Sequence, residues 1–196
     1  PNSLVVGGRV RAWTNLTIGA TGPLTNAPMR NFAVGSTFTD ANGDFTLPGN
    51  SATVTLTFRG RYAGNQTLVQ GTKFTRTVTL TGTSNTIQIY TSSVGAQDFA
   101  QSSIYYWLNG AMEFIIGEIG DRPQLTRLKG VTARVNVNAS CNATYGGYNT
   151  NFYNESTTCN NTAYSSVVVH EWGHGLDDSF GGIARGEMQE GLADTV

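Results

Sequence analysis

Hydrophobic and polar side chains alternate along much of the chain between residue 4 and about residue 90. In segments 53–58 and 75–80 threonine occupies every second position, and the alternation returns in segment 86–90. Successive side chains of a β-strand point to opposite faces, so this pattern predicts strands with one buried face and one polar face. Short strands separated by Gly and Pro are typical of an antiparallel β-sandwich.

A tight turn is predicted at Asn42-Gly43, which lies between two short runs containing phenylalanine. Asn-Gly in this position favours a type I′ hairpin. Asp40, Asn42 and Asp44 also resemble the beginning of a calcium-binding loop, but the downstream Glu that completes such a loop is absent. We therefore favour turn chemistry over calcium binding.

The spacing of apolar residues changes after residue 95 and predicts a long amphipathic helix over residues 96–119. Gly120 and Pro123 follow it and are typical helix stop signals. The apolar positions with helical spacing are Phe99, Tyr106, Trp107, Ala111, Phe114, Ile115 and Ile119.

The remaining elements predict a second, mixed domain. Segment 131–138 alternates as a strand, a helix is expected from about Ala163 to Leu176, and a short final helix is expected near Glu187. The fold class predicted is α+β, with an N-terminal antiparallel β-sandwich over residues 1–92 and a second domain over residues 93–196.

Composition narrows the function classes. Of 196 residues, 39% are hydrophobic and 13% are charged, and the net charge is −1. The sequence lacks the cluster of basic residues that is typical of nucleic-acid-binding proteins. No apolar run reaches the roughly 18–20 residues of a membrane-spanning helix. We therefore expect neither a nucleic-acid partner nor a membrane span. Acidic residues concentrate after His170, with Arg185 as the single basic residue there.

Two features favour an oxidising, extracellular location. Cys141 and Cys159 bracket a loop rich in Gly, Asn and Tyr, which a disulfide would close. The chain also contains N-x-[ST] sequons, the acceptor pattern for N-glycosylation in secreted proteins. The sequon asparagines are Asn15, Asn65, Asn138, Asn142, Asn154 and Asn160.

The strongest chemical motif is H-E-x-x-H at residues 170–174, which contains both histidines of the chain. Four residues on an α-helix make one turn plus about 40°, so His170 and His174 project from one face and can bind one ion. Zinc in such a site lowers the pKa of a bound water to about 7. Glu171, the next residue along, is placed to act as the general base.

A catalytic zinc requires a third protein ligand and one open position. The metzincin pattern needs Gly at position 177 and His at position 180, but Asp177 and Phe180 stand there. Asp177 and Asp178 follow His174 too closely to fold back over the same metal.

The acids after Gly181-Gly182 are better candidates for the third ligand. Glu190 and Asp194 share a helix face, so one can bind the metal while the other accepts a hydrogen bond from a ligand histidine. We assign Glu190 as the ligand and Asp194 as the orienting residue, with Glu187 as the alternative ligand.

The motif H-E-W-G-H-G at residues 170–175, followed by E-G-L-A-D at residues 190–194, resembles the H-E-x-x-H…E-x-x-x-D signature of the gluzincin metallopeptidases, in particular the fungalysin-like members. The resemblance implies a secreted zinc endopeptidase. Residues 93–196 would form the upper lobe of a zincin, with a long helix, a short sheet, a zinc helix and a glutamate helix.

Other segments extend the resemblance over most of residues 96–196. Asn142-Ala143 and the residues after it resemble the edge segment with which thermolysin-like enzymes bind substrate backbone, and segment 96–119 resembles their long helix. The β-rich start is similar to the transthyretin-like or carboxypeptidase-regulatory modules found beside such peptidases.

The helical lobe that completes the cleft of gluzincins is expected to be missing after Val196. Tyr145, Tyr148 and Tyr153 are candidates for the oxyanion contact that this lobe supplies, although packing is the more common role of a tyrosine in such a loop.

Two functions follow from the sequence. The first is a zinc-dependent endopeptidase, or the metal-binding part of one, that hydrolyses peptide or protein substrates. The alternative is an extracellular structural protein that self-associates on a peptidase-derived scaffold through exposed strand edges.

Overall fold

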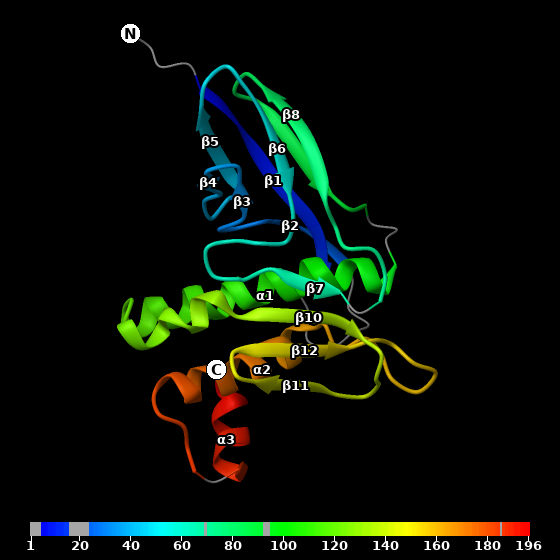
Figure 1. Cartoon of the computed structure of the whole chain (residues 1–196), viewed down its shortest axis with the longest axis vertical. Helices are drawn as coiled ribbons and strands as arrows, with labels where there is room; N and C mark the ends of the chain where they lie inside the picture. Colours follow the sequence, from blue (N-terminus) through cyan, green and yellow to red (C-terminus); the bar gives the residue numbers. More distant parts are fainter. Residues whose placement is uncertain (1–4, 16–23, 69, 92–94, 185) are drawn as a thin grey trace.

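The computed structural model describes residues 5–15, 24–68, 70–91, 95–184 and 186–196. Helices and strands are mixed, so the predicted α+β class is confirmed. The strands that precede residue 57 lie in the upper part of Figure 1, a long helix crosses below them, and a second sheet with two further helices lies beneath that helix.

The first sheet is built around its longest strand, β1 (Val5–Asn15). β2 (Leu24–Pro28) and β5 (Asp44–Pro48) pair antiparallel with β1, and β9 (Asn85–Ile89) pairs parallel with it. The prediction of a purely antiparallel sandwich is therefore wrong for β9. Many residues separate β9 from β1 along the chain, so no hairpin turn forces these two strands to run antiparallel.

A two-stranded sheet, β6 (Ser51–Leu56) with β8 (Arg76–Thr81), carries the predicted threonine face. Thr53 and Thr79 are hydrogen-bonded through their hydroxyl groups at 3.2 Å. The opposite face carries Val54, Leu56 and Leu80, which are buried in the same apolar cluster as side chains of β1 and β5. The alternation of the sequence thus correctly indicated which side chains are buried.

The turn before β5 differs from the predicted type I′ hairpin. Gly43 has a positive φ of 78° but Asn42 does not, and Gly43 N–H donates to the Asp40 carbonyl. The Asp40 carboxylate accepts hydrogen bonds from the backbone N–H of Asn42 and Asp44. The aspartate side chain therefore closes the turn, as the turn-chemistry interpretation expected. Before it, β4 (Thr37–Phe38) pairs with β3 (Ala33–Val34) rather than with β5.

The long helix α1 (Ala96–Ile119) has the predicted bounds and ends at Gly120, whose φ is 78°. Its buried face differs from the predicted one, because Phe114 is 54% exposed while Ile104 and Leu108 are buried. Both sides of its first half are covered, by β1 on one side and by α2 and β10 on the other. A helix between two layers does not show a single apolar stripe.

Polar side chains attach α1 to the first sheet. The buried hydroxyl groups of Thr14 and Ser103 lie 2.9 Å apart, and Ser102 donates a hydrogen bond to the Trp13 carbonyl. The Tyr105 hydroxyl donates to the Arg30 carbonyl. These bonds satisfy polar groups that the helix buries and attach α1 to the N-terminal strands.

The second sheet has the order β11-β12-β10-β7. β10 (Thr132–Val137) pairs parallel with β12 (Asn149–Tyr153) and with β7 (Gln66–Leu68), while β11 (Ala143–Gly146) is an edge strand antiparallel to β12. β7 comes from the N-terminal half. The proposed division at residue 92 therefore cuts through one hydrogen-bonded sheet.

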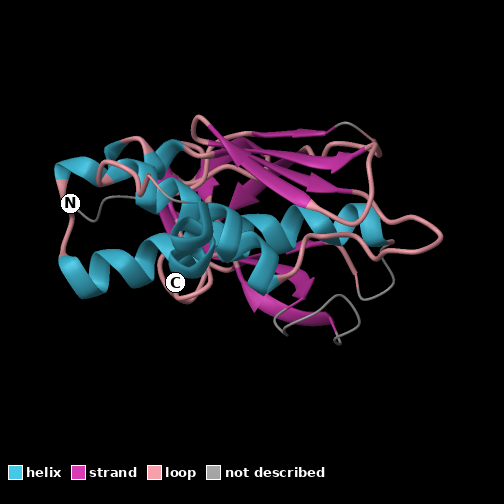
Figure 2. Cartoon of the chain, turned by 90° about the horizontal axis from the view of Figure 1, so that it is seen from below, coloured by secondary structure: helices cyan, strands magenta, loops and turns pink. Residues whose placement is uncertain are grey.

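The C-terminal half is completed by helices α2 (Ser165–Ser179) and α3 (Gly186–Ala193). Two short 3₁₀ turns, η1 (Pro123–Thr126) and η2 (Leu128–Gly130), connect α1 to β10. α1 contacts α2 and α2 contacts α3, so the three helices are grouped together in the view from below (Figure 2). None of the described helices has the length and apolar character needed to cross a membrane.

Buried amide side chains join the segments around the second sheet. Asn136 is fully buried and donates to the carbonyls of Gln70 and Gln97. Asn161 donates to the side-chain oxygen of Asn136 at 2.9 Å, and Asn154 donates to the side chain of Gln70 at 2.8 Å. This amide cluster connects the start of α1, strand β10 and the segment before α2.

The cluster corrects one predicted glycosylation site. Asn154 is 9% exposed and its amide nitrogen is hydrogen-bonded to Gln70, so this fold leaves no room for a glycan there. Asn65, Asn138, Asn142 and Asn160 are exposed. The side chain of Asn15 lies outside the described residues.

Substitution of Asn161 by alanine tests the amide cluster. Asn161→Ala leaves the buried Asn136 oxygen without its donor, so we expect the free energy of unfolding to fall by about 1–3 kcal/mol. Urea denaturation of the unglycosylated protein measures this change. The neighbouring Asn160→Ala serves as the control, because Asn160 is exposed and its loss should change stability by less than about 0.5 kcal/mol. Equal effects of the two substitutions would contradict the interpretation.

Candidate metal centre

Helix α2 has one face buried in the core and one face that lines a cleft. Val168, Trp172 and Leu176 point into the core, and Trp172 is fully buried. Two residues correspond to about 200° around a helix, so the side chains of His170 and His174 lie opposite Trp172. Both histidines are partly buried and line an open cleft. The buried face thus fixes the helix while the other face presents both imidazoles.

The imidazoles of α2 and a carboxylate of α3 meet at one point. The Nε2 atoms of His170 and His174 lie 3.2 Å apart. The Glu190 carboxylate lies 3.2 Å from His170 Nε2 and 3.7 Å from His174 Nε2. These three residues form the group of described residues that could hold a metal ion, with ligand atoms within 4.8 Å of one another.

Asp194 determines which nitrogen of His170 faces this group. Its carboxylate lies 2.8 Å from His170 Nδ1 on the opposite side of the ring. An ionised carboxylate only accepts hydrogen bonds, so the neutral imidazole carries its proton on Nδ1 and presents a lone pair at Nε2. A metal-binding histidine is usually oriented in this way.

The residues present fit a tetrahedral divalent metal. A zinc ion with nitrogen ligands at about 2.0–2.1 Å holds two such nitrogens about 3.3–3.4 Å apart, close to the observed 3.2 Å. Without a cation, the lone pair of His170 Nε2 would face the carboxylate of Glu190. Two imidazoles and one carboxylate are also a donor set that zinc prefers.

Glu171 lies beside this group and points into the cleft. Its side chain is buried, and burial raises its pKa to about 7, with His170 lowering that pKa and Glu190 raising it. The residue is not among the three ligand residues. The structure therefore brings a carboxylate next to the ligand group without adding it to that group.

Both glycines of the H-E-W-G-H-G motif permit close packing. A Cβ atom at Gly173 would lie 2.8 Å from Cα of Ala193, and a Cβ atom at Gly175 would lie 3.0 Å from the ring of Tyr145. Gly173 therefore lets α3 approach α2, and Gly175 lets strand β11 approach it. The motif therefore contains residues needed for helix packing as well as the two ligand histidines.

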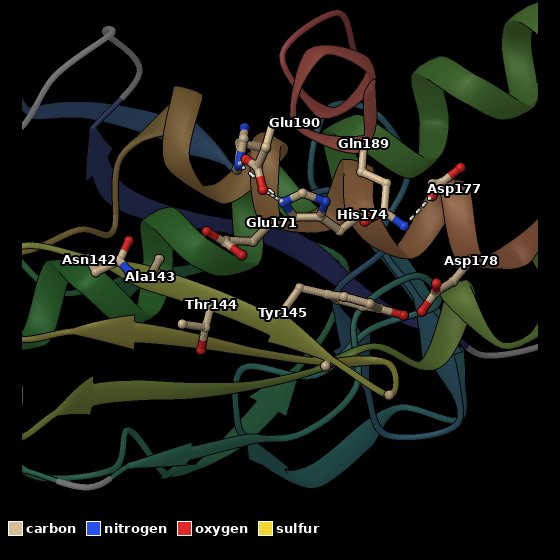
Figure 3. A pocket seen from close by; sticks show the side chains of 13 residues that line it. Asn142, Ala143, Thr144, Tyr145, Glu171, His174, Asp177, Asp178, Gln189 and Glu190 are labelled. Carbon is tan, nitrogen blue, oxygen red and sulfur yellow. Dashed lines mark hydrogen bonds and ion pairs between the residues drawn. The ribbon is translucent and has the colours of Figure 1, made fainter. Parts of the chain in front are cut away.

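The cleft in front of the ligand group has a volume of about 620 Å³. Figure 3 shows α2 and α3 on one side of it and strand β11 on the other. The predicted substrate-binding residues Asn142 and Ala143 line this cleft together with His170, Glu171 and His174. Because β11 is an edge strand, the border of the second sheet faces the ligand group.

A smaller cavity of about 260 Å³ adjoins the ligand group near Cys141 and Tyr164, and His170 and Glu171 line this cavity as well as the large cleft. The predicted disulfide between Cys141 and Cys159 is confirmed, with the two Cα atoms 5.2 Å apart. It links the segment before β11 to the segment before α2. The disulfide therefore restrains both walls of the small cavity.

Of the three tyrosines considered for the oxyanion contact, Tyr145 lines the large cleft, whereas Tyr148 and Tyr153 are not among its described lining residues. The Tyr145 hydroxyl accepts a hydrogen bond from Tyr148 N–H and faces Asp178. Burial raises the pKa of Tyr145, and the Asp178 carboxylate raises it further. The Tyr145 ring lies near the His174 ring, with the two ring centroids 6.3 Å apart, and its hydroxyl is directed at Asp178 near the end of α2.

The structure brings His170, His174 and Glu190 into one group that could hold a metal ion, with the Asp194 carboxylate on the far side of the His170 ring. Glu187 is exposed and is not in the group. Asp177, for which sequence spacing predicted no role, accepts a hydrogen bond from Ile183 N–H in the segment leading to α3. An aspartate near a helix end, shortly before Gly-Gly, is a pattern that could have indicated it.

The chain was compared with protein-family models and with curated protein sequences, and neither comparison found a match.

Substitution of Gly173 tests whether close packing of α3 on α2 holds the site together. In Gly173→Ala the new methyl group collides with the backbone of Ala193, so we expect the free energy of unfolding to fall by about 1–3 kcal/mol. Gly117→Ala in α1 is the matched control, because among the described residues no atom outside the helix's own backbone lies within 4 Å of its Cβ position. Alanine there should be neutral or stabilise the helix by up to about 1 kcal/mol. Thermal and urea denaturation measure both, and a neutral Gly173→Ala would contradict the packing argument.

Proposed function

We propose that this protein is a metal-dependent endopeptidase of the gluzincin type, or the metal-binding part of one. The observation that supports the proposal most strongly is the convergence of His170, His174 and Glu190 within 4.8 Å, at the border of a cleft walled by an edge strand. Metal-assisted hydrolysis of a peptide bond uses a bound metal ion beside a substrate cleft.

Zinc is the metal that we assign to the site. His170 and His174 supply Nε2 ligands and Glu190 supplies a carboxylate oxygen, which leaves room for a substrate or water on the side of the cleft. When bound, the metal supplies a Lewis acid that polarises a carbonyl group and makes water more acidic. Asp194 keeps the His170 ring in the orientation that presents Nε2.

Glu171 acts as the proton carrier in this proposal. Its carboxylate borders both cavities, so it can accept a proton from a water molecule that attacks the scissile carbonyl. It then donates that proton to the departing amine. Because Glu171 is held on the same helix as both histidines, its position relative to them is fixed by helix geometry.

The substrate is proposed to be an extended peptide or protein segment. Strand β11 is at the edge of its sheet, where an extended chain can add as a further strand through backbone hydrogen bonds. Backbone binding of this kind recognises peptides as a class. Side-chain preference would come from the two cavities on either side of Glu171.

Secretion is part of the same proposal. The Cys141–Cys159 disulfide and the exposed sequons at Asn65, Asn138, Asn142 and Asn160 support an oxidising compartment. A glycan on Asn142 would stand at the entrance of the cleft, so the active form is expected to carry none there.

Metal analysis tests the proposed centre directly. We expect the purified protein to bind one zinc ion per chain, and Glu190→Ala to reduce zinc affinity by more than about 100-fold, because a ligand is lost. Affinity is measured by competition with a chromophoric chelator. Glu187→Ala removes an acid from the same helix without removing a ligand, and should leave affinity unchanged. A wild-type protein that stays folded yet binds no zinc would refute the centre.

Substitution of Glu171 tests the chemistry separately from the metal. Glu171→Gln should retain zinc but lower the rate of peptide cleavage by about 10²–10⁴-fold, because the amide cannot accept the proton. Cleavage of a fluorogenic peptide mixture, together with zinc content, gives both values. Equal rates for the two proteins would show that Glu171 is not the base.

A further inference from the structure

The backbone hydrogen bonds within helix α3 are not sufficient to hold this helix in position. It has 8 residues, and isolated helices shorter than about 12–15 residues are marginal in water. The chain before it passes through Gly181 and Gly182, both with positive φ. The Glu190 side chain is 63% exposed, so burial does not fix it either. Contacts between α3 and α2 must therefore determine where the Glu190 carboxylate lies.

Asp177 makes one of those contacts and also binds the turn between the two helices. It lies near the end of α2 and is 7% exposed. Its Oδ2 atom accepts hydrogen bonds from Ile183 N–H at 2.9 Å and from the Gln189 side-chain amide at 3.3 Å. Its carbonyl oxygen accepts bonds from the N–H groups of Phe180 and Gly182. One buried aspartate thus joins the end of α2, the turn and helix α3.

The bond to Gln189 controls the rotation of α3. Successive residues on a helix are about 100° apart, so anchoring Gln189 determines the direction in which Glu190 points. Figure 3 shows the Gln189 side chain directed at Asp177, while the neighbouring Glu190 is directed at His174. The pairing of Asp194 with His170 anchors the other end.

We propose that Asp177 and Gln189 form a positioning pair that holds Glu190 against the Nε2 atoms of His170 and His174. The pair contacts no ligand atom, and its effect on the metal passes through the orientation of α3. A carboxylate suits this role because a charged acceptor strengthens the hydrogen bonds that it receives. The inference rests on the proposed metal centre and identifies how its third ligand is held.

Zinc affinity of matched variants tests the pair. Asp177→Ala and Gln189→Glu should each lower zinc affinity about 10–100-fold, the effect expected when a supporting contact of a ligand is lost. Asp177→Asn retains an oxygen that can accept both bonds and should keep most of the affinity. Asp178→Asn changes the adjacent exposed carboxylate, which faces the Tyr145 hydroxyl instead of α3, and should leave affinity unchanged. Unchanged affinity in both Asp177→Ala and Gln189→Glu would overturn the inference.

A double-mutant cycle separates positioning from a general loss of structure. In a Glu190→Ala background, Asp177→Ala should cause no further loss of zinc affinity, because the ligand that it positions is absent. An equal loss in both backgrounds would overturn the positioning role. If Asp177→Ala does not fold by circular dichroism, Gln189→Glu, at a partly exposed position, replaces it in the cycle. A wild-type protein without zinc would instead refute the metal centre itself.

Discussion

The close approach of α2 and α3 at Gly173 and Ala193 determines the geometry of the whole candidate site. Gly173 immediately precedes His174, and Ala193 immediately precedes Asp194, so the contact lies next to both halves of the ligand arrangement. A side chain at Gly173 would hold the two helices apart. Because metal ligands tolerate displacements of only a few tenths of an ångström, a small separation of the helices would move Glu190 out of range.

That contact is supported by a scaffold in which the two halves of the chain are interleaved. Helix α1 is bonded to the first sheet through hydroxyl groups and contacts α2 on its other side. Strand β7 extends the second sheet from the N-terminal half, and Asn136 links the segments around it. Segments of the β-rich half therefore contribute directly to the scaffold that supports the site.

Burial changes sharply across the site, and this gradient suits the proposed chemistry. Trp172 is fully buried and keeps α2 rigid, whereas Glu190 is largely exposed and can be reached from the cleft. Glu171 lies between these extremes, in surroundings that favour its neutral form more than water does. The ligand helix is therefore packed against the core on one side and open to the cleft on the other, as the proposed chemistry requires.

The sequence by itself determined the features that depend on local spacing. These are the strands with a threonine face and the bounds of α1. They also include the projection of both histidines from one helix face and the presence of Glu190 four residues before Asp194. The tertiary structure alone decided the parallel pairing of β9 with β1, the buried face of α1 and the burial of Asn154. It also decided the contacts of Asp177 and Gly173 with the segment beyond the Gly-Gly turn. These features join residues far apart along the chain or depend on which layer covers an element, and neither is encoded in local periodicity.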